Sequence, residues 1–295
     1  MSALVATLTS LPYTQFRRNK HFYLWYDAFF LVVFGSAVAV MWQTGWTGIT
    51  TEWDPRLLLF SPIAAHILIL AGVWVHNASH GNFPRPINRI MGEICGVIIL
   101  TRFASWEIVH QRHHKYSDDA EADPHPITPD ARGYWAYAWK MVVQVEKVLQ
   151  DIFFEMYGGK TKGNQRYQKW RATLSFGVTY VLMPIFWFTL LGAPAFVMLF
   201  IPASIAGVLH LIHFNWSTHN PWSPDGDHRP VNLNHGFYRV GNWLWHGIYW
   251  HGNHHKSAGL FNPGDMPAHK ALPIIRPGDR TDHYPAKKVR KKKAA

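Results

Sequence analysis

Two triplets of histidines at helical spacing are the residues with the clearest chemical potential in this chain. Positions i, i+3 and i+4 share one face of a helix, so each triplet would project three imidazoles into one small volume. Neutral imidazole is the commonest protein ligand for iron, zinc and copper. The triplets are His110, His113 and His114 in HQRHH, and His251, His254 and His255 in HGNHH. Their repetition predicts a metal site.

Shorter motifs add to this set. His76 and His80 lie at i, i+4 in HNASHG, and Asn215 stands one helical turn before His219. The motifs together hold nine histidines, whereas one metal takes about four to six ligands. Nine imidazoles suit two metals with positions left for water or oxygen. The motifs lack the carboxylates of the Glu-x-x-His di-iron pattern. Zinc has no redox chemistry, whereas nitrogen-rich ligation with open positions suits iron and O₂ activation.

Each motif alone has a simpler interpretation as polarity where a helix leaves a membrane, and it is their joint occurrence that favours metal binding. The other histidines are not expected to be ligands. His210, His213, His235 and His246 lie near the motifs but outside the repeated spacing, and we expect them to support the ligands or to belong to the core. The remaining histidines are assigned no role: His21, His66, His125, His228, His269 and His283.

Composition narrows the class of protein. The chain has 295 residues and one cysteine, which excludes disulfide frameworks and cysteine-rich metal sites. The net charge of +11 comes mostly from basic clusters near the two ends. Such clusters bind nucleic acid or face anionic lipid, and the long apolar segments favour lipid. We therefore expect no nucleic-acid partner, and the first apolar run lacks the features of a cleavable signal peptide.

The hydropathy pattern predicts an all-α integral membrane protein with four transmembrane helices. About 20 apolar residues span a bilayer core. The expected spans are residues 22–43, 57–75, 172–191 and 194–214. A helical cap of residues 76–171 and 215–270 would hold the histidines, followed by a basic tail of residues 271–295. The alternative is a soluble all-α protein with buried helices, which four long apolar runs disfavour.

The arrangement of charge predicts the orientation of these spans. The short loops between spans one and two and between spans three and four carry little positive charge, and the segments rich in Lys and Arg fall on the other side. The positive-inside rule then places both termini and all histidine motifs in the cytoplasm. Residues 92–100 are apolar but too short to span, and residues 220–242 are expected to be irregular.

The motifs resemble those of the membrane fatty acid desaturase superfamily over about residues 70–260. His76–His80 resembles its first histidine box, and the two HxxHH triplets resemble its second and third. The string HHKYSDDAEADPH and the pair Asn215–His219 resemble stearoyl-type acyl desaturases. The chain departs from those enzymes in its short first box, which is closer to acyl-lipid desaturases and carotene ketolases, and in its third box, which lacks the aromatic-Pro ending.

The resemblance implies a single desaturase-like domain that binds two iron ions and uses O₂ as co-substrate. Hydrogen would be removed from an unactivated CH₂ of a fatty acyl chain, with electrons from a separate donor of the ferredoxin, rubredoxin or cytochrome b5 type. Asn215 would reach iron through water, and no general base is assigned. The implied metal ligands are His76, His80, His110, His113, His114, Asn215, His219, His251, His254 and His255.

Residues around the ligands are expected to support them. Acidic groups and one histidine are candidate acceptors for the second ring nitrogens of the ligands. These are Asp118, Asp123, His125 and Asp227, with Asp119, Glu121 and Glu107 as further candidates. An apolar tunnel should hold the acyl chain, and its candidate lining is Trp106, Trp243, Trp245 and Trp250, although interfacial anchoring explains these tryptophans equally well. Arg102, Arg112, Lys115 and Lys256 flank the boxes and would receive an acidic donor or a substrate head group.

Three functions are compatible with these patterns. The first is an acyl desaturase, favoured by the Asp-Pro-His string and Asn215–His219. The second is a related oxidation on the same site: hydroxylation, carotenoid ketolation or formation of a terminal alkene from a fatty acid. The third is a histidine-rich membrane metal binder or transporter that is not an enzyme, which would need ionisable groups within the spans.

Overall fold

The computed structural model describes residues 19–117, 123–124, 133–157, 159–219, 229–276 and 279. The described residues are helical, with no strand among them beyond two isolated bridges at Asn232. The helices in the first part of the chain are α3 (Phe22–Gln43), η1 (Pro55–Phe60), α4 (Ser61–Ser79), α5 (Arg85–Ile98), α6 (Phe103–Tyr116) and α7 (Tyr134–Met156). Those that follow are α8 (Lys162–Gly177), η2 (Val178–Leu182), α9 (Met183–Leu191), α10 (Ala193–Ala195), η3 (Phe196–Phe200), α11 (Ile201–Thr218), α12 (Gly236–Leu244), α13 (His251–Lys256) and η4 (Pro263–Asp265).

Four helices are long and apolar enough to cross a membrane, which confirms the predicted fold class. They are Phe22–Gln43, Pro55–Ser79, Lys162–Leu191 and Ala193–Thr218. Large apolar side chains cover their outer faces, as expected for helices in contact with lipid. The helices of the second, third and fourth spans extend beyond the apolar runs of the sequence. The backbone hydrogen bonds of a helix form within the helix itself, so the helix can continue through polar residues outside the bilayer. This extension keeps His76 within α4.

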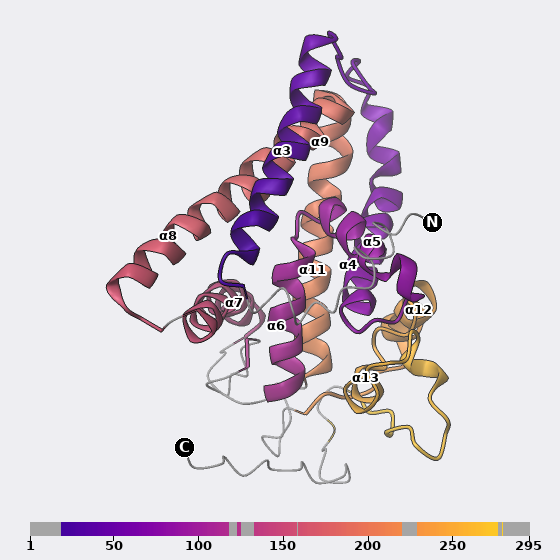
Figure 1. The fold of residues 1–295 in the computed structure, drawn as a ribbon. Coiled ribbons are helices and arrows are strands. Elements are labelled where there is room, and N and C mark those ends of the chain that lie inside the picture. Colours follow the sequence, from indigo (N-terminus) through magenta and orange to yellow (C-terminus); the bar gives the residue numbers. More distant parts are fainter. Residues whose placement is uncertain are drawn as a thin grey trace.

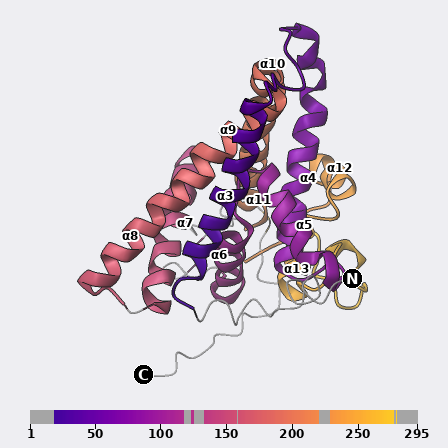
Figure 2. The ribbon, with the colours of Figure 1, turned by 45° about the horizontal axis from the view of Figure 1, so that its top comes forward.

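The spans are arranged as two packed pairs. α4 packs on α11, and α3 packs on α9. Figures 1 and 2 show that α8 diverges from the other spans toward its N-terminal end, where α7 lies beside it. Two π-helical turns, η2 and η3, interrupt the third and fourth spans. Such turns shift the faces of the helix that follows, and they are frequent at functional sites.

The two loops at one end of the bundle are joined through glycines. The backbone amides of Ile49 and Thr50 donate to the carbonyls of Leu190 and Leu191, at 3.0 Å each. A Cβ on Gly48 would lie 2.3 Å from Cα of Gly192, so no side chain fits there. This contact fixes the connection between the first two spans against the connection between the last two. Helices α6 and α13, which carry the two histidine triplets, lie toward the opposite end of the bundle (Figure 1).

A buried ion pair joins three elements near the histidine end. The guanidinium of Arg102, just before α6, pairs with the carboxylate of Asp27 on α3, and both side chains are buried. The same guanidinium donates to Oγ of Ser175 on α8, at 2.9 Å. Removing one partner of such a pair would leave a buried charge uncompensated, so this contact constrains how α3, α6 and α8 meet.

Two local predictions have a clear outcome. Residues 92–100 do not span the membrane: most of them belong to α5, which packs on α4 with Cys95 buried. The prediction that residues 220–242 are irregular is wrong from Gly236 onward, where α12 begins. Aromatic and apolar residues at helical spacing in GFYRVGNWL outweigh the glycines that suggested a loop.

Candidate metal centre and substrate cavity

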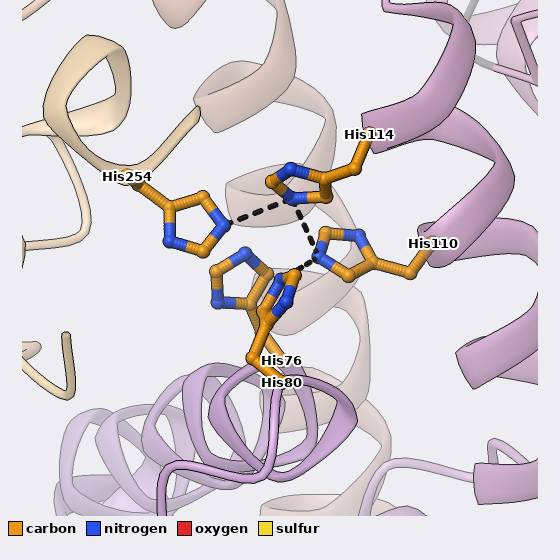
Figure 3. A group of neighbouring side chains, drawn as sticks. All are labelled: His76, His80, His110, His114 and His254. Carbon is orange, nitrogen blue, oxygen red and sulfur yellow. Dashed lines mark hydrogen bonds between the residues drawn. The ribbon is translucent and has the colours of Figure 1, made fainter. Parts of the chain in front are cut away.

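Four elements bring the nine predicted histidines together. His76 lies in the last turn of α4 with His80 as its C-cap, and His219 caps α11. The two triplets lie on α6 and α13. Their ring nitrogens form two groups, and in each group one nitrogen from every residue lies within 4.8 Å of the others. The first group is His76, His80, His110, His114 and His254 (Figure 3), and the second is His113, His219, His251 and His255.

Each HxxHH triplet contributes to both groups. Successive helical residues are about 100° apart, so positions i and i+4 lie about 40° apart while position i+3 diverges to the other side. On α6, His110 and His114 point into the first group and His113 into the second. On α13 the assignment is reversed: His251 and His255 join the second group, and His254 joins the first. The middle histidine of each triplet, His113 on α6 and His254 on α13, therefore joins the group to which the other helix contributes two histidines. This arrangement holds the two groups side by side.

The nitrogens of the first group approach one another closely. Nε2 of His110 lies 2.7 Å from Nε2 of His80 and 3.2 Å from Nε2 of His114. Nε2 of His114 also lies 3.0 Å from Nε2 of His254. Figure 3 shows these rings turned toward a common centre from α4, α6 and α13.

The second group repeats this geometry. Nε2 of His255 lies 3.2 Å from Nε2 of His113 and 3.0 Å from Nε2 of His251. Nε2 of His251 is 3.2 Å from Nε2 of His219. In both groups it is therefore the Nε2 atoms that converge.

Hydrogen bonds alone do not satisfy these nitrogens. A ring nitrogen has one in-plane position, which holds either a proton or a lone pair. Three Nε2–Nε2 contacts join His80 to His110, His110 to His114, and His114 to His254. The first and the last can both be hydrogen bonds. The contact between His110 and His114 then cannot be one, because the in-plane position of each Nε2 is already used. A cation accepts all of the lone pairs at once. Metal–nitrogen bonds of about 2.1 Å at right angles separate neighbouring nitrogens by about 3 Å, so both groups fit a metal ion.

Burial keeps these imidazoles ready to coordinate. It lowers the pKa of His80 to about 4. Burial, followed by repulsion from neighbouring imidazoles, lowers the pKa of His110, His254 and His255 well below the ordinary value. Metal ligation requires neutral histidine, and these shifts hold the ligands unprotonated at neutral pH.

Asp123 supports one ligand directly. Its carboxylate Oδ1 lies 2.8 Å from Nδ1 of His113, and both side chains are buried. The amide of Gln144 on α7 donates to the backbone carbonyl of Asp123 at 2.8 Å and holds this segment in place. An Nδ1–H donated to a carboxylate fixes the tautomer and leaves Nε2 free to bind metal. Of the other predicted supporting residues, Glu107 accepts from Gln111 on its own helix, while Asp118, Asp119, Glu121, His125 and Asp227 lie outside the described residues.

Asn215 lies between the second group and a cavity. Its side chain is buried, and its amide donates to the carbonyl of Leu211 at 2.9 Å. Asn215 and His251 both line an apolar cavity of about 320 Å³. The cavity extends between α4 and α11, where its walls are formed by residues such as Leu68, Val73 and Val208. Histidines of both groups also line it: His76 and His110 from the first, His113 and His251 from the second.

The four predicted tunnel tryptophans occupy different environments. Trp106 lines the cavity, and its ring stacks on His110 with centroids 5.5 Å apart. Trp243 is 81% exposed and lies outside the cavity lining, as interfacial anchoring would require. Trp245 is buried and donates to Nδ1 of His66 at 3.2 Å. The indole of Trp250 packs against Gly264.

The histidines outside the motifs have other contacts. His210 lines the cavity, with Nε2 3.3 Å from the hydroxyl of Tyr249. His213 contacts Ser217, and His246 packs between Trp74 and Phe261. His235 packs on Tyr238, His21 contacts Tyr167, and His269 is exposed. His125, His228 and His283 lie outside the described residues.

A pair of buried asparagines, Asn232 and Asn253, holds α13 and was not predicted from the sequence. Nδ2 of Asn232 donates to Oδ1 of Asn253 at 2.8 Å and to the carbonyl of Leu272 at 2.9 Å. The backbone amide of Asn253 donates back to Oδ1 of Asn232 at 2.9 Å, and Leu272 donates to Asn253. Asn253 lies between His251 and His254 in the third motif, HGNHH. An amide side chain between two expected ligands is the feature of the sequence that could have indicated its supporting role.

The fatty acid desaturase family model matches residues 53–270, from before the second span to beyond the third histidine motif. The chain belongs to the fatty acid desaturase family. This confirms the superfamily expected from the histidine motifs. No curated protein and no solved structure matches the chain in the corresponding searches. The family, the two histidine groups and the four apolar spans identify an integral membrane oxidoreductase that acts on fatty acids, in a family that is typically iron-dependent.

Single substitutions should remove metal from one group at a time. We expect His110→Ala to reduce binding in the first group and His255→Ala in the second, so that each variant retains roughly half of the metal, because each group keeps a complete set of ligands when the other is damaged. Elemental analysis of purified protein measures this directly. His269→Ala, an exposed histidine outside both groups, is the control and should bind as much metal as the unaltered chain. Unchanged metal in both ligand variants would contradict the assignment.

The Asp123 carboxylate should strengthen metal binding in the second group. Asp123→Asn keeps the shape of the side chain but removes its charge, and we expect metal affinity to fall by roughly 10- to 100-fold. Competition with a chelator measures the affinity. The matched control is Asp151→Asn, which removes a carboxylate from a surface pair with Lys160, and an equal loss in both variants would rule out a specific role for Asp123.

Proposed function

We propose that this protein is a di-iron acyl desaturase that introduces a double bond into a fatty acyl chain. The observation that carries the proposal is the position of the 320 Å³ cavity, whose wall includes His76 and His110 of one histidine group and His113 and His251 of the other. A CH₂ held at this end of the cavity lies beside both groups. Two iron ions and O₂, with electrons from a separate donor protein, supply the oxidising chemistry.

The chain's own residues position the substrate and exclude water. Leu68, Ile69 and Val73 on α4 face Val208 and Leu211 on α11 across the cavity. These apolar side chains suit an acyl chain and not a polar metabolite. Positioning of this kind is the protein's main contribution where a cofactor carries the reaction. The histidines and Asn215 are assigned to metal binding, Asn215 through water, and no residue is assigned as a general base.

The surface near the histidine groups suits an acidic electron donor of the ferredoxin, rubredoxin or cytochrome b5 type. Lys115 and Lys256 are exposed on α6 and α13, the helices that carry the two triplets. Arg112 lies on α6 with its guanidinium 5.1 Å from the centre of the Tyr116 ring. Complementary charge steers such encounters. From the excess of Lys and Arg on this side of the spans, and the positive-inside rule, we infer that the termini and the histidine motifs lie in the cytoplasm.

The product tests the proposed reaction. We expect cells that express the chain to contain an unsaturated fatty chain that is absent from cells expressing His254→Ala, in which the first group loses a ligand. Mass spectrometry of total lipids and volatile hydrocarbons detects it, and the position of the double bond gives the regiochemistry. The His269→Ala protein should behave like the unaltered chain.

Other products would replace desaturation by a related reaction. The short HNASHG motif at His76 and His80 favours the alternatives of hydroxylation, carotenoid ketolation or terminal-alkene formation. An alcohol, a ketone or a terminal alkene in place of the unsaturated acyl chain would therefore overturn the desaturase and leave the metal centre intact.

The depth of the cavity should set the length of the acyl chain. Gly207 lines the cavity eight residues before Asn215, about 12 Å along the helix. A Cβ there would contact only Leu68, at 3.8 Å, so a larger side chain can enter the space of the substrate. We expect Gly207→Leu to disfavour the longest accepted chain by roughly 1–3 kcal/mol and to shift products toward shorter chains. Gly35→Leu, on α3 with open space around it, is the control, and an unchanged length profile in Gly207→Leu would refute the prediction.

A further inference from the structure

A second and larger cavity adjoins the first. Its volume is about 780 Å³, and α6, α7 and the α8–η2 segment form its walls. The two cavities share five lining residues: Leu100, Thr101, Trp106, Tyr180 and Leu211. We call these five shared residues the neck; a ligand in the second cavity lies next to the cavity that the histidine groups line.

The wall formed by α8 changes character along its length. Lys169, Thr173, Phe176 and Tyr180 line the second cavity at intervals of four, three and four residues, which places them on one helical face. The stripe runs from a cation through a hydroxyl to two aromatic rings, over about 16 Å of helix. Only its aromatic end, at Tyr180, also borders the first cavity. This gradient matches an amphiphile with its head at Lys169 and its chain directed to the neck.

The polar end of the second cavity is cationic. Among the described residues that line it, Arg102, Lys169 and Arg171 are basic and none is acidic. Arg102 is neutralised by Asp27. Arg171 lies against the Phe153 ring, with its guanidinium carbon 3.8 Å from the ring centre, and donates to Gln168. Lys169 is the one exposed cation of the three, since Arg102 and Arg171 are buried, and it gives this end a positive charge that suits an anionic head group.

The apolar end of the second cavity faces the bilayer. Tyr180, Phe176 and Val142 line it and are also 63%, 60% and 58% exposed. Phe176 and Tyr180 belong to the third membrane span, so what they are exposed to is lipid. Tyr180 lies in the π-helical turn η2, and α8 diverges from the other spans below this turn (Figure 2). Exposed side chains of α7 and of the third span thus border the second cavity on the side that faces lipid.

We propose that the second cavity is a lateral entry site that takes an acyl chain with an anionic head group from the membrane. Lys169 holds the head at the membrane surface, and the tail passes Tyr180 and Trp106 into the histidine-lined cavity. This assignment rests on the proposed function for its substrate and adds the substrate class: a lipid already in the bilayer, with a carboxylate or a phosphate at its head.

Photo-crosslinking tests the site without metal or turnover. The metal-free protein in phosphatidylcholine nanodiscs is labelled with two fatty acids of equal length, one with a diazirine beside the carboxylate and one with a diazirine near the methyl end. We expect the head probe to label α7 and α8 near Gln150 and Lys169–Thr173, and the tail probe to label residues 68–73 or 204–211. A head probe found at residues 204–208, or both probes confined to the first cavity, would overturn the proposal.

Charge variants separate recognition from simple partitioning into the protein. Lys169→Glu should reduce labelling by the head probe roughly tenfold, because attraction to the carboxylate becomes repulsion. Lys169→Arg should retain labelling, and Lys162→Glu, the same change at an exposed position of α8 outside the cavity, should have no effect. A chain-matched fatty alcohol probe, which has no charge, should be insensitive to Lys169→Glu. Equal labelling by the acid in Lys169→Glu and in the unaltered chain would contradict the site.

Competition identifies the source of the head group. Displacement of the head probe by unlabelled fatty acid alone supports a carboxylate, and displacement by added phosphatidylglycerol supports a phospholipid. If the probes map as expected but the cells contain no oxidised lipid, the proposed function fails and the binding site stands. If desaturation is observed while the probes map elsewhere, only the entry site fails.

Discussion

Nine imidazoles in one small volume, six of them buried and three partly buried, are the constraint on which the rest of this structure depends. Nε2 atoms from elements that are distant in the sequence approach one another to 2.7–3.2 Å. Burial without complete hydrogen bonding is unfavourable, so packing elsewhere must hold the rings in place. The pairing of α4 with α11 and of α3 with α9 provides that support. Metal binding by the histidines would offset part of the unfavourable free energy of burying them. Occupancy of the metal site would therefore increase the stability of the fold.

The exchange of middle histidines between α6 and α13 links the two halves of the centre. Because His113 and His254 each cross to the group formed mainly by the other helix, neither helix can shift without disturbing both groups. The separation of the two histidine groups is therefore set by the contact between α6 and α13. The apolar cavity meets this contact at His110 and His113, so the same geometry sets which histidines border the cavity.

The sequence predicted the spans and the clustered histidines because both depend on local spacing. Apolar length alone defines a membrane helix, and the i, i+3, i+4 pattern alone defines a shared face. The division of each triplet between two groups depends on how α6 and α13 face each other, which spacing does not encode. Trp106 and Trp243 show the same limit: one lines the cavity and the other lies at the surface, although the sequence treats them alike. The second cavity also arises from packing, where α8 diverges from the bundle.

The asparagine pair at Asn232 and Asn253 has a consequence for how the protein is made. α13 has only six residues, too few to be a stable helix in isolation. Its three histidines are held by bonds to Asn232 and to Leu272, a residue that follows every histidine of the two groups in the chain. During synthesis, the four spans are made before Leu272, so they can enter the membrane before the hydrogen bonds among Asn232, Asn253 and Leu272 form. We therefore expect the metal centre to mature late, in a protein already resident in its membrane, with a supply of iron at that membrane surface.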